Sequence, residues 1–284
     1  MLFNEKILSL DSSVSCASCH KPEYAFADTV AFSKGIHEKP TARNTPSVLN
    51  MKERPYYFWD GRASSLEAQS LLPIANPDEM GLPIKDAVYR LNHNRLYRGL
   101  FYRVFKRAPS AENLSSALAA YEQTLETVNS KFDEVSNGKG KLTAAEERGR
   151  KLFIGPKAKC FDCHTGPDFT GDDFKSIGLL NEEYFKDSGR YAITKKQKDL
   201  GLFKVPGLRN VAVTAPYMHN GMFASLEQVL AYYNNPSAFF TYPLNMDPEL
   251  KKPLNLSKQE QSDIIAFLKT LTDQAYSQNR PTKF

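Results

Sequence analysis

The sequence predicts an all-α chain that folds as two related domains in tandem, with short β structure or none. Three observations support this prediction. A short motif of two cysteines and a histidine occurs twice, a longer block after each copy is repeated, and the apolar segments have helical spacing. A polar stretch that contains Gly138 and Gly140 is typical of a linker, so we place the domains at residues 1–138 and 139–284.

The two motifs are Cys16-Ala17-Ser18-Cys19-His20 and Cys160-Phe161-Asp162-Cys163-His164, and together they use every cysteine of the chain. This spacing is the attachment signature of haem c, in which two thiols add to the vinyl groups and the histidine ligates the iron. A zinc site or a disulfide framework would also use paired cysteines, but neither explains a histidine directly after each pair. We therefore expect two covalently bound haems, with His20 and His164 as proximal iron ligands.

The longer block runs from Trp59 to Glu67 in the first half and from His219 to Glu227 in the second. Gly, Ser, Leu and Glu occur at equal offsets in the two copies. An Arg-Asn pair also follows each haem motif, at Arg43-Asn44 and at Arg209-Asn210. These similarities indicate two diverged copies of one haem module.

Capping boxes mark the start of two helices in the second half. Thr143 with Glu146 begins a helix that leads to the second haem motif, and Ser257 with Glu260 begins a helix that closes the module. The apolar spacing from Leu114 to Leu125 predicts the closing helix of the first module. A helix before the motif and a helix that closes the module are the arrangement of a small cytochrome c, so both domains are expected to be cytochrome c-like.

The two modules differ at the position that would supply the sixth iron ligand. Counting twelve residues on from Gly61 and Gly221 gives Pro73 in the first module and Tyr233 in the second. Proline has no side-chain donor atom, whereas a phenolate can ligate iron. We therefore expect an open site for a small oxidant at the first haem and a closed haem suited to electron transfer in the second module.

Other side chains compete for these ligand positions. Met218 and Met222 offer thioethers to the second iron, His219 offers an imidazole, and Tyr233 could instead be a packing residue. His37 lies in a Gly-containing loop from which it could reach the first iron.

Composition narrows the class of protein further. No apolar run approaches the length of a membrane span, and the segment that begins at Met1 is not a signal peptide. Because haem c assembly normally needs an exported chain, we expect a periplasmic protein whose signal peptide has been removed or trimmed. Haem propionates would offset much of the formal charge of +5, so the charge identifies no nucleic-acid partner.

These motifs resemble the bacterial dihaem cytochrome c peroxidase family, which includes the MauG enzymes of methylamine utilisation. The similarity keeps the order of the family motifs over nearly the whole chain. The matching segments are Ser15 to His20, Arg43 to Asn50, Phe58 to Ala63, Glu67 to Gln69, Pro73 to Met80, Phe203 to Asn210 and Ala215 to Gly221.

The resemblance implies reduction of hydrogen peroxide to water at the N-terminal haem, with electrons passed from the C-terminal haem. The expected electron donor is a small redox protein, either a cytochrome c or a cupredoxin. A homodimer is one of the oligomeric states that we consider. The alternative is a MauG-like oxidase that uses peroxide to oxidise a protein or a small organic substrate. A simple electron carrier is the non-enzymatic alternative, but a carrier needs no proton-handling residues.

The resemblance also assigns residues to the peroxide site. Gln69 and Glu79 would line the distal pocket, and Trp59 would carry electrons between the haems. A carboxylate whose pKa is raised by desolvation can take a proton from peroxide and return it to the leaving oxygen. On the sequence alone, Glu79 could instead cap a helix that begins near Gly81 to Pro83, and Trp59 could be a core residue.

The family further implies a calcium ion, held by the Asn44 side chain and by backbone oxygens of Thr214 and Pro216. The distal ligand of the second haem is methionine in peroxidases of the electron-accepting kind and tyrosine in MauG, and the matching position here is Tyr233. A loop histidine caps the first haem in well-studied peroxidases. His37 is displaced by one residue from that position.

Overall fold

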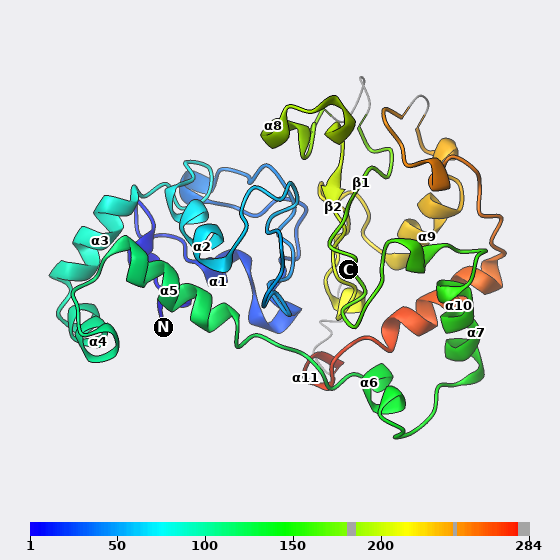
Figure 1. Ribbon diagram of the computed structural model, residues 1–284, viewed down its shortest axis with the longest axis horizontal. Helices are drawn as coiled ribbons and strands as arrows, with labels where there is room; N and C mark the ends of the chain where they lie inside the picture. The colour runs from blue at the N-terminus through cyan, green and yellow to red at the C-terminus, as the bar shows by residue number, and fades with distance from the viewer. Residues whose placement is uncertain (181–185, 241–242, 278–284) are drawn as a thin grey trace. The chain divides into compact units, whose positions relative to one another are not determined.

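The chain forms two compact units, in a computed structural model that describes residues 1–180, 186–240 and 243–277 (Figure 1). The first unit comprises Met1–Tyr57 and Ala63–Glu126, and the second comprises Phe58–Arg62 and Thr127–Phe284. The chain thus passes from the first unit to the second between Glu126 and Thr127, ahead of the predicted boundary at residue 138. The short segment Phe58–Arg62 lies between the two parts of the first unit in sequence but packs with the second unit.

The prediction of a mostly helical fold is confirmed. The helices of the first unit are α1 (Cys16–Cys19), α2 (Leu66–Ala75), α3 (Ile84–His93), α4 (Arg95–Phe105) and α5 (Ala111–Glu122). Those of the second are α6 (Lys131–Ser136), α7 (Ala144–Ile154), α8 (Tyr191–Thr194), α9 (Leu226–Asn234), α10 (Lys258–Lys269) and α11 (Gln274–Ser277). Within the described residues, β1 (Phe174–Lys175) and β2 (Phe203–Lys204) pair antiparallel as the one two-stranded sheet.

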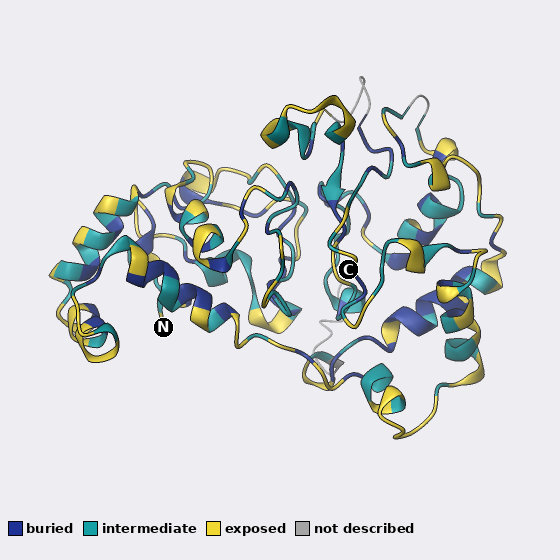
Figure 2. Ribbon diagram, viewed as in Figure 1, coloured by how far each residue is buried: buried dark blue, intermediate teal, exposed yellow. Residues whose placement is uncertain are grey.

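The core of the first unit lies between α2, α3, α4 and α5, and most positions on α5 are buried or half-buried (Figure 2). Polar side chains fix where these helices begin. Asn94 accepts hydrogen bonds from two backbone N–H groups of α4, and Ser110 forms a capping box with Asn113 at the start of α5. Cys16 packs against this core, so the hydrophobic cluster supports the first haem motif directly.

The core of the second unit is built on the crossing of α7 and α10. Both predicted capping boxes are present, with Thr143 and Glu146 at α7 and Ser257 and Glu260 at α10. The helices approach closely at Gly149, where an added Cβ would lie 1.9 Å from the backbone oxygen of Asp263. A larger residue there would force the helices apart.

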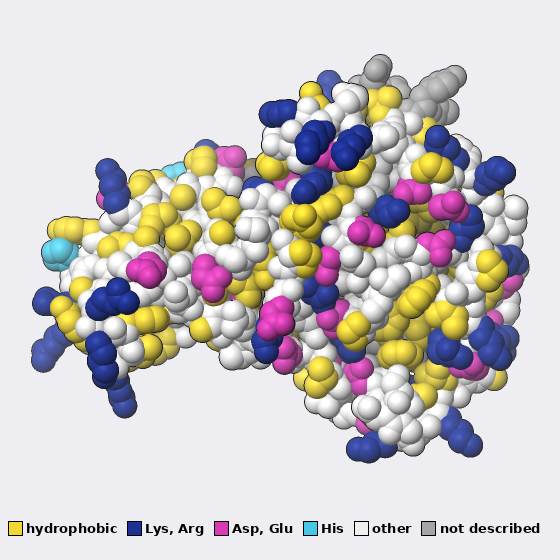
Figure 3. Space-filling model, viewed as in Figure 1, with side chains coloured by type: hydrophobic (Ala, Val, Ile, Leu, Met, Phe, Trp, Pro, Cys, Tyr) yellow, Lys and Arg dark blue, Asp and Glu magenta, His cyan; other side chains and the backbone are white. Residues whose placement is uncertain are grey.

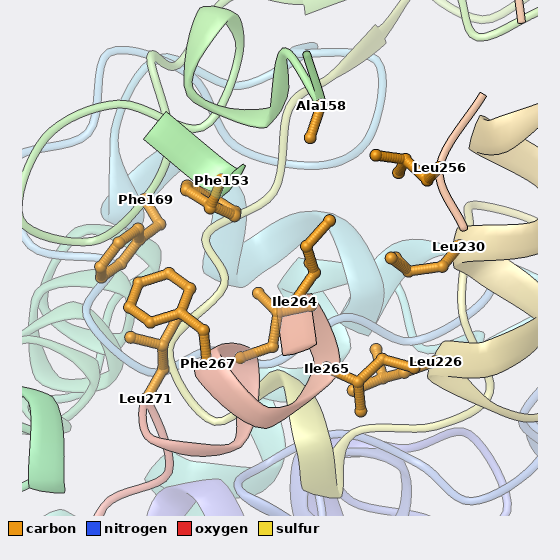
Figure 4. Packing of buried hydrophobic residues seen from close by; sticks show 11 residues of the cluster. Phe153, Ala158, Phe169, Leu226, Leu230, Leu256, Ile264, Ile265, Phe267 and Leu271 are labelled. Atoms are coloured by element: carbon orange, nitrogen blue, oxygen red, sulfur yellow. The ribbon is translucent and has the colours of Figure 1, made fainter. Parts of the chain in front are cut away.

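Apolar side chains from α7, α9 and α10 converge at this crossing, as Figure 4 shows. Phe153, Phe169 and Phe267 meet through ring contacts with centroids 5.3 to 6.1 Å apart. Cys160 packs against the same cluster. Each module therefore places its haem motif against its own hydrophobic core.

Basic side chains are exposed in both units. Arg95, Arg98 and Arg103 are exposed on α4, and Lys195 and Lys196 are exposed after α8. Figure 3 shows Lys and Arg side chains at both helices. Exposed basic side chains therefore occur in both units among the described residues.

No helix among the described residues is long and apolar enough to cross a membrane.

Candidate haem and peroxide site

Both haem motifs fold as a single tight turn that brings the two cysteines to one side. In the first module, α1 spans Cys16–Cys19 and begins with a capping box between Ser15 and Ser18. In the second, Cys160–Asp162 forms a 3₁₀ turn. The backbone N–H of the following histidine donates 2.9 Å to the carbonyl of the first cysteine in both modules. The two copies thus present the same arrangement of thiols and imidazole.

Both proximal histidines are oriented in the way that iron ligation requires. Nδ1 of His20 lies 3.0 Å from the Phe26 carbonyl oxygen, and Nδ1 of His164 lies 2.9 Å from that of Phe169. A carbonyl only accepts, so Nδ1 carries the proton and Nε2 presents its lone pair to a metal. Burial lowers the pKa of both imidazoles, which favours the neutral form that binds iron.

The cysteines fit haem attachment better than the other chemistries. All four are free thiols, so the disulfide alternative is wrong. Within the described part of the chain, no group of three or more His, Cys, Asp or Glu residues is arranged to hold a metal ion. Burial raises the pKa of Cys16 and Cys160 to about 12, so both are neutral thiols in the folded chain.

The predicted proton-handling residues lie at and just after α2. Gln69 and Pro73 are four residues apart on this helix and therefore share a face. The side-chain oxygen of Gln69 is buried and accepts no hydrogen bond from the described residues. A buried acceptor of this kind is normally satisfied by a water or a ligand, which fits the distal role predicted for Gln69.

The turn after α2 brings Glu79 back to the first haem motif. The N–H of Met80 donates to the carbonyl of Pro73 at 3.2 Å, which folds the turn against the end of the helix. Glu79 is half-buried, and its Oε1 accepts a 2.7 Å hydrogen bond from Nδ2 of Asn76. Its charge is among those that, after burial, raise the pKa of Cys16 and Cys19, so it lies within electrostatic range of the motif.

Glu79 does not cap a helix. The helix that follows, α3, begins after Pro83 and has no side-chain hydrogen bond at its N-cap. The alternative structural role for Glu79 is therefore wrong.

Tyr233 lies on α9 beside the second haem motif. Burial, and then the charges of Tyr232, Cys163 and Cys160, raise the pKa of the Tyr233 hydroxyl well above its usual value. The neighbouring Tyr232 is fully buried, and its hydroxyl donates to the carbonyl of Ile177. Of the two adjacent tyrosines, Tyr232 is therefore part of the core, and Tyr233 lies within electrostatic range of the cysteines of the motif.

The competing ligands of the second iron have other partners. The sulfur of Met222 lies 3.8 Å from Nδ2 of Asn220, and Met218 and Met222 both pack on the cluster around Phe223. His219 is buried at 5% exposure, and its ring stacks on Phe203 with centroids 3.7 Å apart. These contacts give each of them a packing role.

Trp59 belongs to the second unit although its sequence follows the first haem motif. Its carbonyl oxygen accepts a 2.7 Å hydrogen bond from the N–H of Lys204 in β2. Its indole contacts the ring of His219, with centroids 6.5 Å apart at 70°. Trp59 is half-buried and contacts the His219 ring, and among the described residues it is not part of the hydrophobic core clusters at α5 and at the crossing of α7 and α10.

The residues expected to bind calcium are divided between the units. Asn44 is buried in the first unit, and its Nδ2 donates to the carbonyls of Val30 and Ala31 at 3.2 and 3.3 Å. These bonds use the amide nitrogen, so a cation would be held by Oδ1. Thr214 and Pro216 follow the 3₁₀ turn Val211–Val213 of the second unit.

His37 is largely exposed. It lies in the 3₁₀ turn Ile36–Glu38 at a positive φ of 56°, and its side chain is 60% exposed. The imidazole Nδ1 lies 3.8 Å from a carboxylate oxygen of Asp11. The turn itself contacts the site region, because the N–H of Ile36 donates 2.8 Å to the carbonyl of Glu79.

The structure corrects one detail of the repeat. The Arg-Asn pairs are not equivalent positions, because Asn210 corresponds to Asn50 and not to Asn44. Asn50 and Asn210 both adopt positive φ, and their N–H groups donate to Leu125 and Leu271, the residues that follow the closing helices. The second Arg-Asn pair therefore lies six residues out of register with the first. A match of two residues is too short to align the two modules.

The longer repeated block is confirmed in the same register. Tyr57 and Tyr217 each donate a backbone N–H to the residue six positions on, at 2.9 and 2.8 Å. Ser65 and Ser225 then cap α2 and α9. The two helices are therefore equivalent, and Pro73 and Tyr233 stand at the same position within them.

Sequence reasoning did not identify Asn76 and Glu122. Asn76 lies in the family segment from Pro73 to Met80, and its role follows only from the hydrogen bond to Glu79. Glu122 ends α5, is buried at 5% exposure, and affects the pKa of Cys16 by its charge. Burial raises the pKa of Glu122 to about 7. The sequence did contain a signal for Glu122, because the helical spacing of α5 places this carboxylate on the apolar face of the helix.

The fold and the two motifs define a protein with two c-type haem domains. The model of the di-haem cytochrome c peroxidase family matches residues 1–141, and that of the cytochrome c family matches residues 146–272. The chain belongs to the di-haem cytochrome c peroxidase family, and it is an oxidoreductase with two covalently bound haems.

Similar proteins of known sequence include both branches of this family. The chain is 37% identical to the methylamine utilization protein MauG of Methylorubrum extorquens, over 95% of this chain and 76% of that protein. It is 36% identical to the cytochrome c551 peroxidase of Nitrosomonas europaea, over 96% of this chain and 78% of that protein.

Solved structures agree with this assignment. A MauG-like protein associated with microbial copper homeostasis has a TM-score of 0.88 and 31% identity, and the match covers 98% of this chain and 89% of that one. The diheme peroxidase BthA of Burkholderia thailandensis has a TM-score of 0.85 and 26% identity, and the match covers 97% and 85%.

Proposed function

We propose that the chain reduces hydrogen peroxide at the haem of the first module, with electrons that enter through the haem of the second. The observation that carries this division is the pairing of Pro73 with Tyr233 at equivalent positions of α2 and α9. Proline offers no ligand atom, so the first iron keeps a site for peroxide. A tyrosine at the same position of the second module closes that site to exogenous ligands.

The haem iron supplies the site at which peroxide binds and receives electrons. Glu79 takes the proton that peroxide loses on binding and delivers it to the departing oxygen as water forms. Gln69 holds the peroxide or a water through its buried side-chain oxygen. One peroxide takes up two electrons and two protons and gives two molecules of water, so two one-electron donors are oxidised in each cycle.

The donor is a small redox protein, a cytochrome c or a cupredoxin, and Trp59 is the relay between the two haems. A calcium ion held by Asn44, Thr214 and Pro216 supports the first haem. The protein works in the periplasm, where c-type haems are attached. These assignments rest on the family to which the chain belongs and on the positions of the matching residues.

Steady-state turnover tests the proposal. The holoenzyme is mixed with a reduced c-type cytochrome or a reduced cupredoxin, and donor oxidation is followed with and without hydrogen peroxide. We expect peroxide-dependent oxidation of two donor molecules per peroxide. Absence of peroxide-dependent oxidation with both donor classes, in protein with its full haem content, would contradict the peroxidase function.

A MauG-like oxidase is the second candidate, and Tyr233 is the observation that favours it. An anionic phenolate stabilises ferric iron more than a thioether does, which makes the second haem a poorer acceptor of electrons from a mild donor. In that case peroxide would be consumed only when a protein or a small organic substrate is oxidised. Slow turnover with redox proteins and rapid turnover with such a substrate would support this candidate.

A further inference from the structure

A loop from the first module is held inside the second unit. We name the segment Phe58–Arg62 the tryptophan loop. Its backbone is fixed at two points, because Lys204 N–H donates 2.7 Å to the carbonyl of Trp59 and Nη1 of Arg190 donates 3.2 Å to that of Asp60. Both hydrogen bonds are accepted by backbone carbonyl groups of the loop, so they do not depend on the loop side chains.

Arg190 also anchors the loop by packing. Its guanidinium lies 3.7 Å from the centroid of the Phe174 ring in β1. Gly61 packs against this pair, and an added Cβ there would lie 2.3 Å from the Phe174 ring and 2.5 Å from Nη1 of Arg190. Gly61 has a positive φ of 69°, so the position favours glycine for two reasons.

The indole has its own ring partners. His219 stacks on Phe203 at 3.7 Å with an interplanar angle of 12°, and its ring also contacts the Trp59 ring. His219 stands in the second block at the position that Trp59 has in the first. The residues equivalent by the repeat therefore contact each other within one unit.

Most of these contacts come from a segment of the second module that is longer than the equivalent segment of the first. Pro46 and Pro206 are equivalent, since each lies beside the proximal histidine of its module. The segment from His164 to Pro206 is longer than that from His20 to Pro46, and it contains β1, Arg190 and β2. The longer segment of the second module thus contains the residues that bind the tryptophan loop.

We propose that Arg190, Phe174, Phe203 and His219 form a socket that fixes Trp59, and that this socket sets the rate of electron transfer between the haems. The inference rests on the proposed relay role of Trp59. One electron passes from the second haem through Trp59 to the first, with no bond made or broken. Arg190 and His219 are positioning residues, since Arg190 holds the loop that carries Trp59 and His219 contacts the Trp59 ring.

The test measures electron transfer between the haems of the holoenzyme after one electron is delivered by flash photoreduction. Arg190→Met removes the guanidinium that holds both Asp60 and Phe174, and Gly61→Ala pushes on the same contact. Trp59 is the only tryptophan, so its fluorescence lifetime reports on its position alone. Lys195→Met is the matched control, because Lys195 also lies over an aromatic ring, that of Tyr191, at 5.9 Å.

We expect Arg190→Met and Gly61→Ala to change the Trp59 lifetime and to slow electron transfer relative to the parent, with both haem spectra unchanged. Arg190→Lys should be intermediate, because an ammonium keeps the charge but lacks the planar fork. His219→Phe should retain most of the rate, and His219→Ala should not. Lys195→Met should behave as the parent.

Two results would overturn the socket. The parent rate in Arg190→Met and Gly61→Ala, with or without a changed Trp59 lifetime, would show that the contacts do not govern transfer. If Trp59→Phe itself transfers electrons at the parent rate, the relay in the proposed function fails, and the socket fails with it. If electron transfer is slow in Trp59→Phe but proceeds at the parent rate in Arg190→Met and Gly61→Ala, the relay role of Trp59 stands and only the socket fails.

Discussion

The Asn76 amide donates a 2.7 Å hydrogen bond to Oε1 of Glu79. Asn76 is itself fixed by the turn after α2, because its backbone carbonyl accepts from the N–H groups of Glu79 and Gly81 at 3.1 and 2.8 Å. The hydrogen bond fixes the direction in which the Glu79 carboxylate points. Asn76 therefore orients the proposed acid–base group without taking part in proton transfer.

Replacing Glu79 should slow the reaction with peroxide. Glu79→Gln keeps the shape and the hydrogen bond to Asn76 but cannot accept a proton, so we expect a loss of about 10²- to 10⁴-fold. Stopped-flow mixing of the ferric enzyme with peroxide measures this rate. Asp78→Asn is the matched control, since Asp78 is an exposed carboxylate one residue away. A Glu79→Gln enzyme that reacts at the parent rate would assign the proton transfer to another group.

Replacing Tyr233 should open the second haem. Tyr233→Phe removes the phenol oxygen, so the second haem should change from low-spin towards high-spin or water-ligated, and Tyr233→Met should raise its potential. Tyr232→Phe is the control, and it should lose about 1 kcal/mol of stability with its hydrogen bond to Ile177 while leaving the spectrum unchanged. An unchanged spectrum in Tyr233→Phe, with a changed one in Met218→Leu or Met222→Leu, would make the ligand a methionine.

Removing calcium should disturb the first haem. A hard cation held by one amide oxygen and two backbone oxygens completes its shell with water, and a chelator can compete for it. We expect chelation to change the spin state of the first haem or to lower peroxide turnover, and added calcium to reverse the change. Asn44→Ala should mimic chelation. The role is contradicted if spectrum and turnover are both unaffected once metal analysis shows that calcium is gone.

Glu122 should make stability fall as pH rises from about 4.5 to about 7. Burial raises the folded-state pKa of Glu122 from 4.5 to about 7, so its contribution is fully present below pH 4.5 and is lost up to about 7. At about 1.4 kcal/mol per pKa unit the loss is on the order of 3 kcal/mol.

Glu122→Gln should therefore be more stable than the parent at pH 8 and similar to it at pH 4.5. Thermal unfolding of the holoenzyme over this pH range measures the difference. Glu112→Gln, an exposed carboxylate on the same helix, should show no such dependence. Equal pH profiles for Glu122→Gln and the parent would contradict the assignment.

Local signals in the sequence predicted the parts of the fold that depend on neighbouring residues. The capping boxes at Thr143 and Ser257 fixed two helix starts, and the Cys-x-x-Cys-His spacing fixed the haem attachment. The equal offsets after Gly61 and Gly221 fixed the pairing of Pro73 with Tyr233. The capping boxes and the haem motifs act within about one or two turns of helix, and the twelve-residue offset acts within a single repeated block.

Contacts between distant segments could not be predicted in this way. Trp59 joins the second unit through β2 and His219, far away in sequence, and β1 and β2 are too short to show an alternating pattern. The Arg-Asn pairs gave a wrong alignment of the two modules, because a match of two residues is too short to set the register. The choice between Tyr232 and Tyr233 was made from the repeat, and the hydrogen bond of Tyr232 to Ile177 adds a structural reason for it.

An EPR spectrum of the resting ferric protein tests the central claim most directly, because it counts the spin states of the two irons. The open site at Pro73 and the closed one at Tyr233 predict one high-spin and one low-spin haem in equal amounts per chain, with the high-spin signal lost on addition of peroxide. Two low-spin haems that do not respond to peroxide would contradict the account and would identify an electron carrier.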